Sequence, residues 1–304
     1  MKPSIRCNDN IAELKKIPDA SVDLVYIDPP FNSNRDWDDF NDKWESMDSY
    51  IEFMKPRIAE IHRILKPTGS MFMHVDSSAN AYLRVATDRI FGQSSMVNEI
   101  TWRRSRPKRS TSRLSNVTDT IYWFAKSNKF TFNPLFKSLS PGSNTRYDKV
   151  DTDGRRYMER TITAPGSMKT WAFGIGEKQP RPGRGYSWSK ERIEDGIKKG
   201  ILYPGTAGFL VTRRYMNESK GSPVTNLWDD IHHVMSRESL QYATQKPEKL
   251  IERVISTSSN PGDTVLDAFA GSGTTCAVAK RLGRKSICID QNPKACKIMK
   301  TRLE

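Results

Sequence analysis

The chain has 304 residues, of which 36% are hydrophobic and 28% charged, and its formal net charge is +14. This length can bury a substantial core in one large domain or two smaller ones. No run of about 18 apolar residues occurs, which argues against a transmembrane helix, and the first residues lack the apolar stretch of a signal peptide. Cys7, Cys276, Cys288 and Cys296 have no metal-ligand spacing, so we expect four reduced, mostly buried thiols and no metal site.

The first part of the chain alternates strand and helix signals. The most regular helix pattern lies at 49–65, where apolar residues recur on one face, and Asp9 is expected to cap an earlier helix. The expected strands are 5–7, 22–27, 70–75, 99–102 and 120–124, and the expected helices are 10–16, 49–65 and 79–90. Alternation of this kind predicts a largely parallel sheet with helices on both faces.

The pattern breaks down in the middle of the chain and then resumes. Residues 127–230 are rich in Gly, Pro, Arg and aromatic residues and show few clean periods apart from a helical pattern at 189–199. Later in the chain, we expect helices at 249–257, 274–282 and 293–302 and strands at 264–267 and 285–289. The sequence therefore predicts an α/β domain built from residues 1–126 and 231–304, with an inserted subdomain at 127–230.

Positive charge is concentrated in the middle of the chain. Residues 101–220 contain 25 Lys and Arg against 10 Asp and Glu, whereas residues 1–100 contain 12 against 16. A basic segment of this kind is typical of proteins that contact nucleic-acid phosphates, although a basic surface can also serve solubility alone. The candidate DNA-binding residues are Arg103, Arg104, Arg106, Lys108, Arg109 and Arg113.

The expected strand at 22–27 runs into Asp28-Pro29-Pro30-Phe31. Each proline has a fixed φ and no amide hydrogen, and it pushes the residue before it out of helical space. The carboxylate of Asp28 and the carbonyl of Pro29 are therefore held as acceptors beside an aromatic ring. Such a corner suits an exocyclic amino group whose flat ring stacks on Phe31. An ordinary tight turn after a strand is the alternative interpretation.

A second motif, from Thr264 to Thr275, combines a strand, a glycine loop and a helix start. Glycines allow close approach of the backbone to a ligand, and Asp290, at the end of the next strand, could accept both hydroxyls of a ribose. A triphosphate loop would need Gly-Lys-Ser/Thr, and a dinucleotide loop would need glycine where Cys276 stands. Unless the glycines only form a packing turn, an adenosine-containing ligand without pyrophosphate fits better, and S-adenosylmethionine is such a ligand.

Asp28–Phe31 and the run from Asp267 to Thr275 closely resemble the catalytic and cofactor motifs of DNA amino-methyltransferases. Their order, with the catalytic motif first and an insert between them, resembles the beta class. Further matches, especially to proteins like type III modification subunits, lie at 8–10, 69–76, 226–231 and 244–247. The resemblance covers residues 1–125 and 225–304. The insert matches only in general character, as expected for a target-recognition region.

The resemblance implies a Rossmann-like S-adenosylmethionine-dependent methyltransferase fold with a circularly permuted motif order. It also implies direct in-line methylation of N6 of an adenine flipped out of duplex DNA, without a metal or a covalent enzyme intermediate. The catalytic residues would be Asp28, Pro29, Pro30 and Phe31. The cofactor-binding residues would be Asp9, Ile27, Lys246, Asp267, Phe269, Ala270, Gly271, Ser272, Gly273, Thr274 and Asp290. Asp290 would hold the ribose, Asp9 the adenine, and Lys246 with the glycine loop the methionine portion.

N4-cytosine methylation is the nearest alternative, but such enzymes more often have Ser where Asp28 stands. An RNA or protein-glutamine amino-methyltransferase fits the basic insert and the motif order less well. A non-catalytic DNA-binding relative would carry a damaged motif, whereas both motifs are whole. The expected partner is double-stranded DNA, and the sequence leaves open a homodimer and a cognate restriction endonuclease. We expect a cytoplasmic protein, encoded by a bacterium, an archaeon or a phage, that acts on DNA in the nucleoid.

Overall fold

The structure is a computed structural model that describes residues 3–32, 42–107, 109, 112–139, 141–234, 238, 240, 242 and 244–303. The chain forms two compact units, the first comprising Met1–Leu135 and Val224–Glu304 and the second Phe136–Pro223. The second unit falls within the insert that the sequence predicts at 127–230 and is shorter than it at both ends.

The first unit is built on one mixed sheet. Its strands are β1 (Ser4–Cys7), β2 (Val22–Ile27), β3 (Leu65–Val75), β4 (Met96–Arg103), β5 (Thr118–Ala125), β14 (Leu227–Trp228), β15 (Thr264–Asp267) and β16 (Lys285–Asp290). In the described part of the chain their order across the sheet is β1-β16-β15-β2-β3-β5-β4-β14. Only the pairings of β5 with β3 and with β4 are antiparallel, so the prediction of a largely parallel sheet is confirmed.

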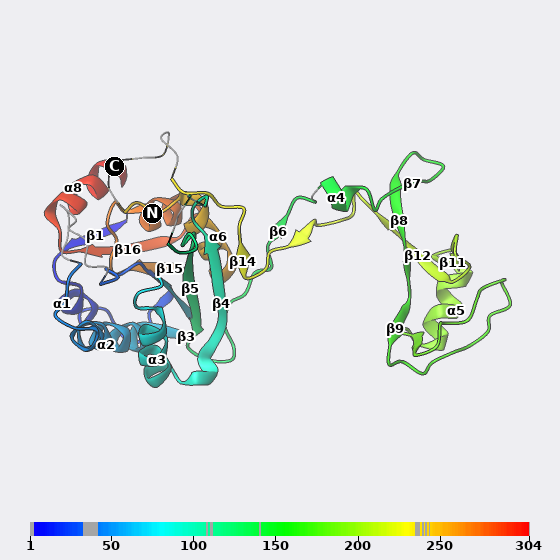
Figure 1. Ribbon diagram of the computed structural model, residues 1–304, viewed down its shortest axis with the longest axis horizontal. Coiled ribbons are helices and arrows are strands. Elements are labelled where there is room, and N and C mark those ends of the chain that lie inside the picture. The colour runs from blue at the N-terminus through cyan, green and yellow to red at the C-terminus, as the bar shows by residue number, and fades with distance from the viewer. Residues whose placement is uncertain are drawn as a thin grey trace. The chain divides into compact units, whose positions relative to one another are not determined.

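This strand order brings the two ends of the chain together. β1 pairs with β16 in parallel, and Figure 1 shows the blue N-terminal strand beside the red-orange C-terminal segment. β15 pairs in parallel with β2, with Asp267 opposite Tyr26. The carboxyl ends of these two central strands therefore meet at one edge, where open α/β sheets bind ligands.

Helices cover both faces of the sheet. They are α1 (Asn10–Leu14), α2 (Met47–Ile64), α3 (Asn80–Phe91), a 3-10 turn at Gln93–Ser95, α6 (Glu248–Ser258), α7 (Thr274–Arg281) and α8 (Pro293–Leu303). Because side chains alternate along a strand, Val25 and Ile27 of β2 pack in the core beneath α2 and α3, whereas Leu24 and Tyr26 pack beneath α6 and α7. Both faces of the central strands are thus buried, as is usual for parallel sheets.

Several boundaries differ from their predictions by a few residues, and the start of β3 differs most in its consequence. The sequence predicts that residues 66–69 end a helix and that the next strand starts at 70, but β3 begins at Leu65. The register between β2 and β3 shifts between Val22 and Leu24, which accommodates the extra residues. Gly69 is suited to this passage because a Cβ there would lie 3.0 Å from the carbonyl oxygen of Asp23. The chain therefore runs directly from helix into strand.

The second unit contains short elements. A four-stranded sheet has the order β11-β12-β8-β7, and two further strand pairs, β10-β9 and β13-β6, lie outside it. The elements are β6 (Phe136–Lys137), α4 (Pro141–Asn144), β7 (Lys149–Val150), β8 (Arg156–Thr161), β9 (Thr163–Pro165), β10 (Arg184–Tyr186), α5 (Lys190–Lys198), β11 (Leu202–Pro204), β12 (Leu210–Tyr215) and β13 (Ser222–Pro223). Tyr186, Ile193, Leu202 and Leu210 form part of its core. The helix expected at 189–199 is confirmed.

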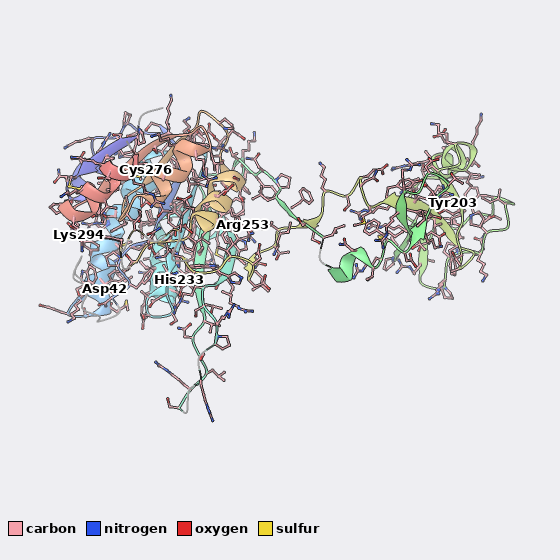
Figure 2. All side chains as sticks on the ribbon, turned by 90° about the horizontal axis from the view of Figure 1, so that it is seen from above. Asp42, Tyr203, His233, Arg253, Cys276 and Lys294 are labelled. Atoms are coloured by element: carbon pink, nitrogen blue, oxygen red, sulfur yellow. A yellow bond between two sulfur atoms is a disulfide. The ribbon has the colours of Figure 1, made fainter. Side chains whose placement is uncertain are left out.

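The cysteines contradict the expectation of four reduced thiols. The structure joins Cys7 to Cys296, with Cα atoms 5.9 Å apart, and Cys276 to Cys288, with Cα atoms 6.3 Å apart. The cause is the strand order: β1, β16, α7 and α8 pack together, so residues up to 289 positions apart in sequence become neighbours. Cys276 is labelled in Figure 2. Among the described residues, no helix is long and apolar enough to cross a membrane.

Candidate functional site

The two sequence motifs line one cavity of the first unit. Its volume is 740 Å³, within the range typical of ligand pockets, and it lies beyond the carboxyl ends of β2 and β15. Asp28 and Phe31 come from one motif, and Phe269 and Gly271 from the other. Asp42 and His233, both labelled in Figure 2, also line it.

Asp28 lies at the turn that follows β2. The hydroxyl of Tyr50 donates to the carbonyl of Pro30 at 2.6 Å, which ties this turn to α2. The ammonium of Lys246 donates to Oδ2 of Asp28, and the two side chains are 14% and 15% exposed. The same ammonium lies 5.6 Å from the centre of the Phe31 ring. The acidic corner predicted from the sequence is therefore present, and its carboxylate is paired with the ammonium of Lys246.

A buried polar chain lies behind Asp28. Nδ1 of His74 is 3.8 Å from Oδ1 of Asp28 and 3.1 Å from the hydroxyl of Tyr26. Nε2 of His74 is 3.2 Å from Asp119, which also accepts a hydrogen bond from Arg104 at 2.8 Å. Burial raises the pKa of Asp119, but the bonds from His74 and Arg104 outweigh it and bring the pKa below its ordinary value. This series of polar side chains lies between the basic segment after β4 and the acidic corner at Asp28.

Asp267 holds the glycine loop in place through two hydrogen bonds. Its Oδ1 accepts the backbone amide of Phe269 at 3.0 Å, and its Oδ2 accepts the hydroxyl of Thr275 at 2.5 Å. The side chain is buried, and burial raises its pKa to about 7, although the two hydrogen bonds act in the opposite direction. Asp267 thus fixes the strand end, the loop and the first turn of α7 relative to one another.

Asp290 and two glycines fix the loop from the other side. The carboxylate of Asp290 accepts the amides of Gly271 and Asn292, each at 2.8 Å. Burial raises the pKa of Asp290, against the effect of these two bonds. Gly271 and Gly273 have φ values of 50° and 76°, in the left-handed region that favours glycine. A Cβ on Gly273 would lie 2.6 Å from Cγ of Met299, so the loop has no room for a side chain there.

Asn10 of α1 and Arg57 of α2 form a hydrogen-bonded bracket that completes the cavity wall. Asn10 donates to the carbonyl of Ala268 at 2.8 Å and accepts from Nε of Arg57 at 2.6 Å. Arg57 also donates to Asp9 at 3.0 Å, and its guanidinium stacks on Phe53. Asp9 caps α1, as the sequence predicts, by accepting the amides of Ile11 and Ala12.

The structure brings most predicted site residues to the cavity. The predicted residues that line it are Asp9, Asp28, Pro29, Pro30, Phe31, Lys246, Asp267, Phe269, Ala270, Gly271, Ser272, Thr274 and Asp290. Ile27 is instead buried in the core, and Gly273 is the N-cap of α7. Neither of these two residues lines the cavity.

The basic cluster divides into two parts. Arg104 lines the cavity and pairs with Asp119. The other described members, Arg103, Arg106, Arg109 and Arg113, are exposed, and Lys108 lies outside the described residues. Exposed arginines of this kind remain available to phosphates.

Sequence reasoning missed several residues of the site. Asn10 and His74 belong to the runs 8–10 and 69–76, whose match to the family assigns these two residues no role. Arg57 and Asp119 had no sequence signal, because only the packing of α2 and β5 shows that they are buried. Within the described ranges, no cluster of three or more His, Cys, Asp or Glu side chains could hold a metal ion.

Comparisons with known proteins agree on one family. The family model N6_N4_Mtase, "DNA methylase", matches residues 22–301. The type II methyltransferase M.EcaI of Enterobacter cloacae is 30% identical over 310 residues, which cover 97% of this chain and 68% of that protein. The DNA adenine methyltransferase YhdJ of Escherichia coli K12 is 29% identical over 300 residues, covering 97% and 81%.

A solved structure extends the comparison to the fold. A DNA modification methylase from Thermus thermophilus, complexed with S-adenosyl-L-methionine, aligns with a TM-score of 0.55 and 17% identity, covering 99% of this chain and 93% of that one. At this identity the likeness shows a common fold, in agreement with the Rossmann-like methyltransferase fold that the sequence predicts.

Proposed function

This chain belongs to the DNA methylase family, and on that premise we propose that it is a site-specific DNA methyltransferase that transfers a methyl group from S-adenosylmethionine to N6 of an adenine. The observation that carries the proposal is the common cavity of Asp28–Phe31 and the glycine loop, at the ends of two adjacent parallel strands. Similarity to YhdJ, which is named a DNA adenine methyltransferase, favours adenine as the base.

The cavity residues fit S-adenosylmethionine. The glycine loop brings bare backbone to the cavity, where a side chain at Gly271 would press against Tyr242 at 3.1 Å. Asp290 offers a carboxylate for ribose hydroxyls, and Asp9 lies on the same wall for the adenine. Neither a triphosphate loop nor a dinucleotide loop is present. When bound, S-adenosylmethionine supplies a methyl group activated by its sulfonium.

The chain's own residues would prepare the base for attack. The target adenine must leave the duplex because its N6 is stacked and paired there. Asp28 and the carbonyl of Pro29 would accept the two N6 hydrogens, and Phe31 would stack on the ring. These contacts turn the nitrogen lone pair out of conjugation and toward the methyl group. Positioning and preorganised acceptors then provide the rate enhancement.

N4-cytosine methylation is the second candidate, since the same acceptors can hold a cytosine amino group and the matched family model covers both bases. The aspartate at position 28 favours adenine, because N4-specific relatives more often carry serine there. A non-catalytic DNA-binding relative is disfavoured because both motifs are intact and share the cavity.

Duplex DNA is the partner on which enzymes of this family act. We assign target recognition to the insert, on its composition, and phosphate contacts to the exposed arginines that follow β4. Membership of the beta class, a homodimer, a cognate restriction endonuclease and a cytoplasmic location at the nucleoid stay predictions.

The test is methylation-aware sequencing of DNA from cells that express the wild type or Asp28→Ala. We expect N6-methyladenine within one short sequence for the wild type and about 10²- to 10⁴-fold slower transfer for the variant, with binding of S-adenosylhomocysteine retained. Methylated cytosine would select the N4 alternative. Equal methylation by the variant would contradict the role of Asp28.

A further inference from the structure

The ammonium of Lys246 is placed where the target amino group should go. It donates to Oδ2 of Asp28, and it lies 5.6 Å from the centre of the Phe31 ring, on which the base would stack. An exocyclic amino group and an ammonium both donate N–H bonds to a carboxylate. With Lys246 in this position, its ammonium competes with the amino group of the base for Oδ2 of Asp28.

The rest of Asp28 offers no substitute acceptor. Its Oδ1 is buried and makes no hydrogen bond with any described residue. Nδ1 of His74 lies 3.8 Å away and contacts the hydroxyl of Tyr26. Lys246 is thus the only donor to this carboxylate within the described part of the chain.

Lys246 cannot simply withdraw. Both side chains of the pair are more than four-fifths buried, and separating a buried pair without a new counter-ion leaves two uncompensated charges. A second anion inside the cavity would remove this obstacle. Lys246 and the glycine loop line the same cavity, and S-adenosylmethionine carries an α-carboxylate.

We propose that Lys246 makes insertion of the base conditional on the cofactor: its ammonium holds Asp28 in the free protein and moves to the cofactor's carboxylate, which frees Asp28 for the amino group. This inference rests on the proposed function and deepens it. The coupling is reciprocal, so insertion of the base at Asp28 strengthens binding of the cofactor by the same factor. Lys246 is accordingly a positioning residue and does not itself react.

The first test needs no DNA. Calorimetry compares S-adenosylhomocysteine with its decarboxylated analogue, which keeps the amino group and the neutral sulfur. The ratio of their affinities isolates the carboxylate. In Asp28→Asn, Lys246 is no longer held by a charge, so we expect this ratio to rise about fivefold or more above that of the wild type. In Lys246→Met and in the double variant, the ratio should fall toward 1.

A matched control is available in an ion pair between β3 and β2. Lys66 forms a similar pair with Asp23 near the start of β2, at 2.8 Å, and neither residue lines the cavity. Lys66→Met should leave the affinity ratio unchanged. A ratio in Asp28→Asn that equals or falls below that of the wild type would overturn the inference. If the wild type binds neither compound, the proposed function itself has failed.

A second readout follows base insertion. Duplexes that carry 2-aminopurine at the methylated position report unstacking by their fluorescence. For the wild type we expect a stronger rise with S-adenosylhomocysteine than with the decarboxylated analogue. For Lys246→Met the two compounds should give the same rise. A wild-type signal that does not depend on the carboxylate would contradict the coupling, even if methylation is normal.

Discussion

Asn10 donates its side-chain amide to the carbonyl of Ala268 over 2.8 Å, which makes the first helix and the late glycine loop one wall of the cavity. Asn10→Ala would leave that carbonyl and Nε of Arg57 without their partner. We expect S-adenosylhomocysteine to bind about tenfold more weakly, or about 1.4 kcal/mol, measured by calorimetry. Asn98→Ala, at an exposed position on β4, is the control. Equal affinities in the two variants would show that the bracket does not shape the site.

Gly273 is required for two separable reasons. Its φ is 76°, and a Cβ at this position would clash with Met299. Gly283 has a φ of 75°, but a Cβ there would meet only Pro261, at 4.0 Å. Gly283→Ala therefore measures backbone strain alone, about 1–2 kcal/mol. We expect Gly273→Ala to lower the free energy of unfolding by about 1–3 kcal/mol more than that, as measured in urea.

The additional loss of unfolding free energy in Gly273→Ala should vanish when Met299 is shortened to alanine. In a Met299→Ala background, Gly273→Ala should cost about as much as Gly283→Ala, since the clashing Cγ is gone and the remaining Cβ lies at an ordinary contact distance of 3.4 Å. A cost that persists in this background would mean that the clash with Met299 is not its cause.

Asp267 should give the protein a characteristic pH dependence. Its pKa is about 7 in the folded protein and near 3.8 when unfolded, so unfolding releases a proton between these values. The free energy of unfolding should therefore fall as the pH rises from about 4 to about 7, by at most about 1.4 kcal/mol per pH unit, and level off above that range. Asp267→Asn should lack this component. Urea unfolding of both proteins over this range measures the difference, and a constant difference would contradict the assignment.

The exposed arginines should act through phosphates. Replacing Arg103, Arg106, Arg109 and Arg113 by Gln should weaken DNA binding and reduce the slope of log K against log salt by about 0.9 for each phosphate that is no longer neutralised. The control replaces Lys297 and Lys300, exposed on α8, which packs against β1 at the opposite edge of the sheet from β4. Fluorescence anisotropy at several salt concentrations measures both slopes. An unchanged slope in the arginine variant would place the cluster away from the phosphates.

The sequence predicts the α/β unit well because its signals are local. Strands such as 22–27 and 264–267 are short apolar runs bounded by turn residues, and the structure has them at the same positions. Even the meeting of Asp28 and Asp267 at adjacent strand ends follows from motif order and the rules for parallel sheets.

The remaining features depend on packing, which a single sequence does not display. β8 and β12 are half-exposed strands, and their mixture of Arg, Tyr and Thr gives no clean alternation. The pairing of Cys7 with Cys296 spans 289 positions and becomes visible only when β1 lies beside β16. The motif around Lys246 predicts a place at the cofactor, whereas its bond to Asp28 depends on a contact between residues 218 positions apart.

The order of the strands also bears on the synthesis of this protein. The ribosome makes Asp28 before β15 and β16, which complete the sheet around β2 and follow only after the whole second unit has been made. A nascent or truncated chain that stops before Asp290 therefore contains the proposed acceptor, Asp28, without the complete glycine-loop wall of the cavity. If the proposed function holds, we expect such a fragment to transfer no methyl group, so activity would begin only after the chain through Asp290 has been made.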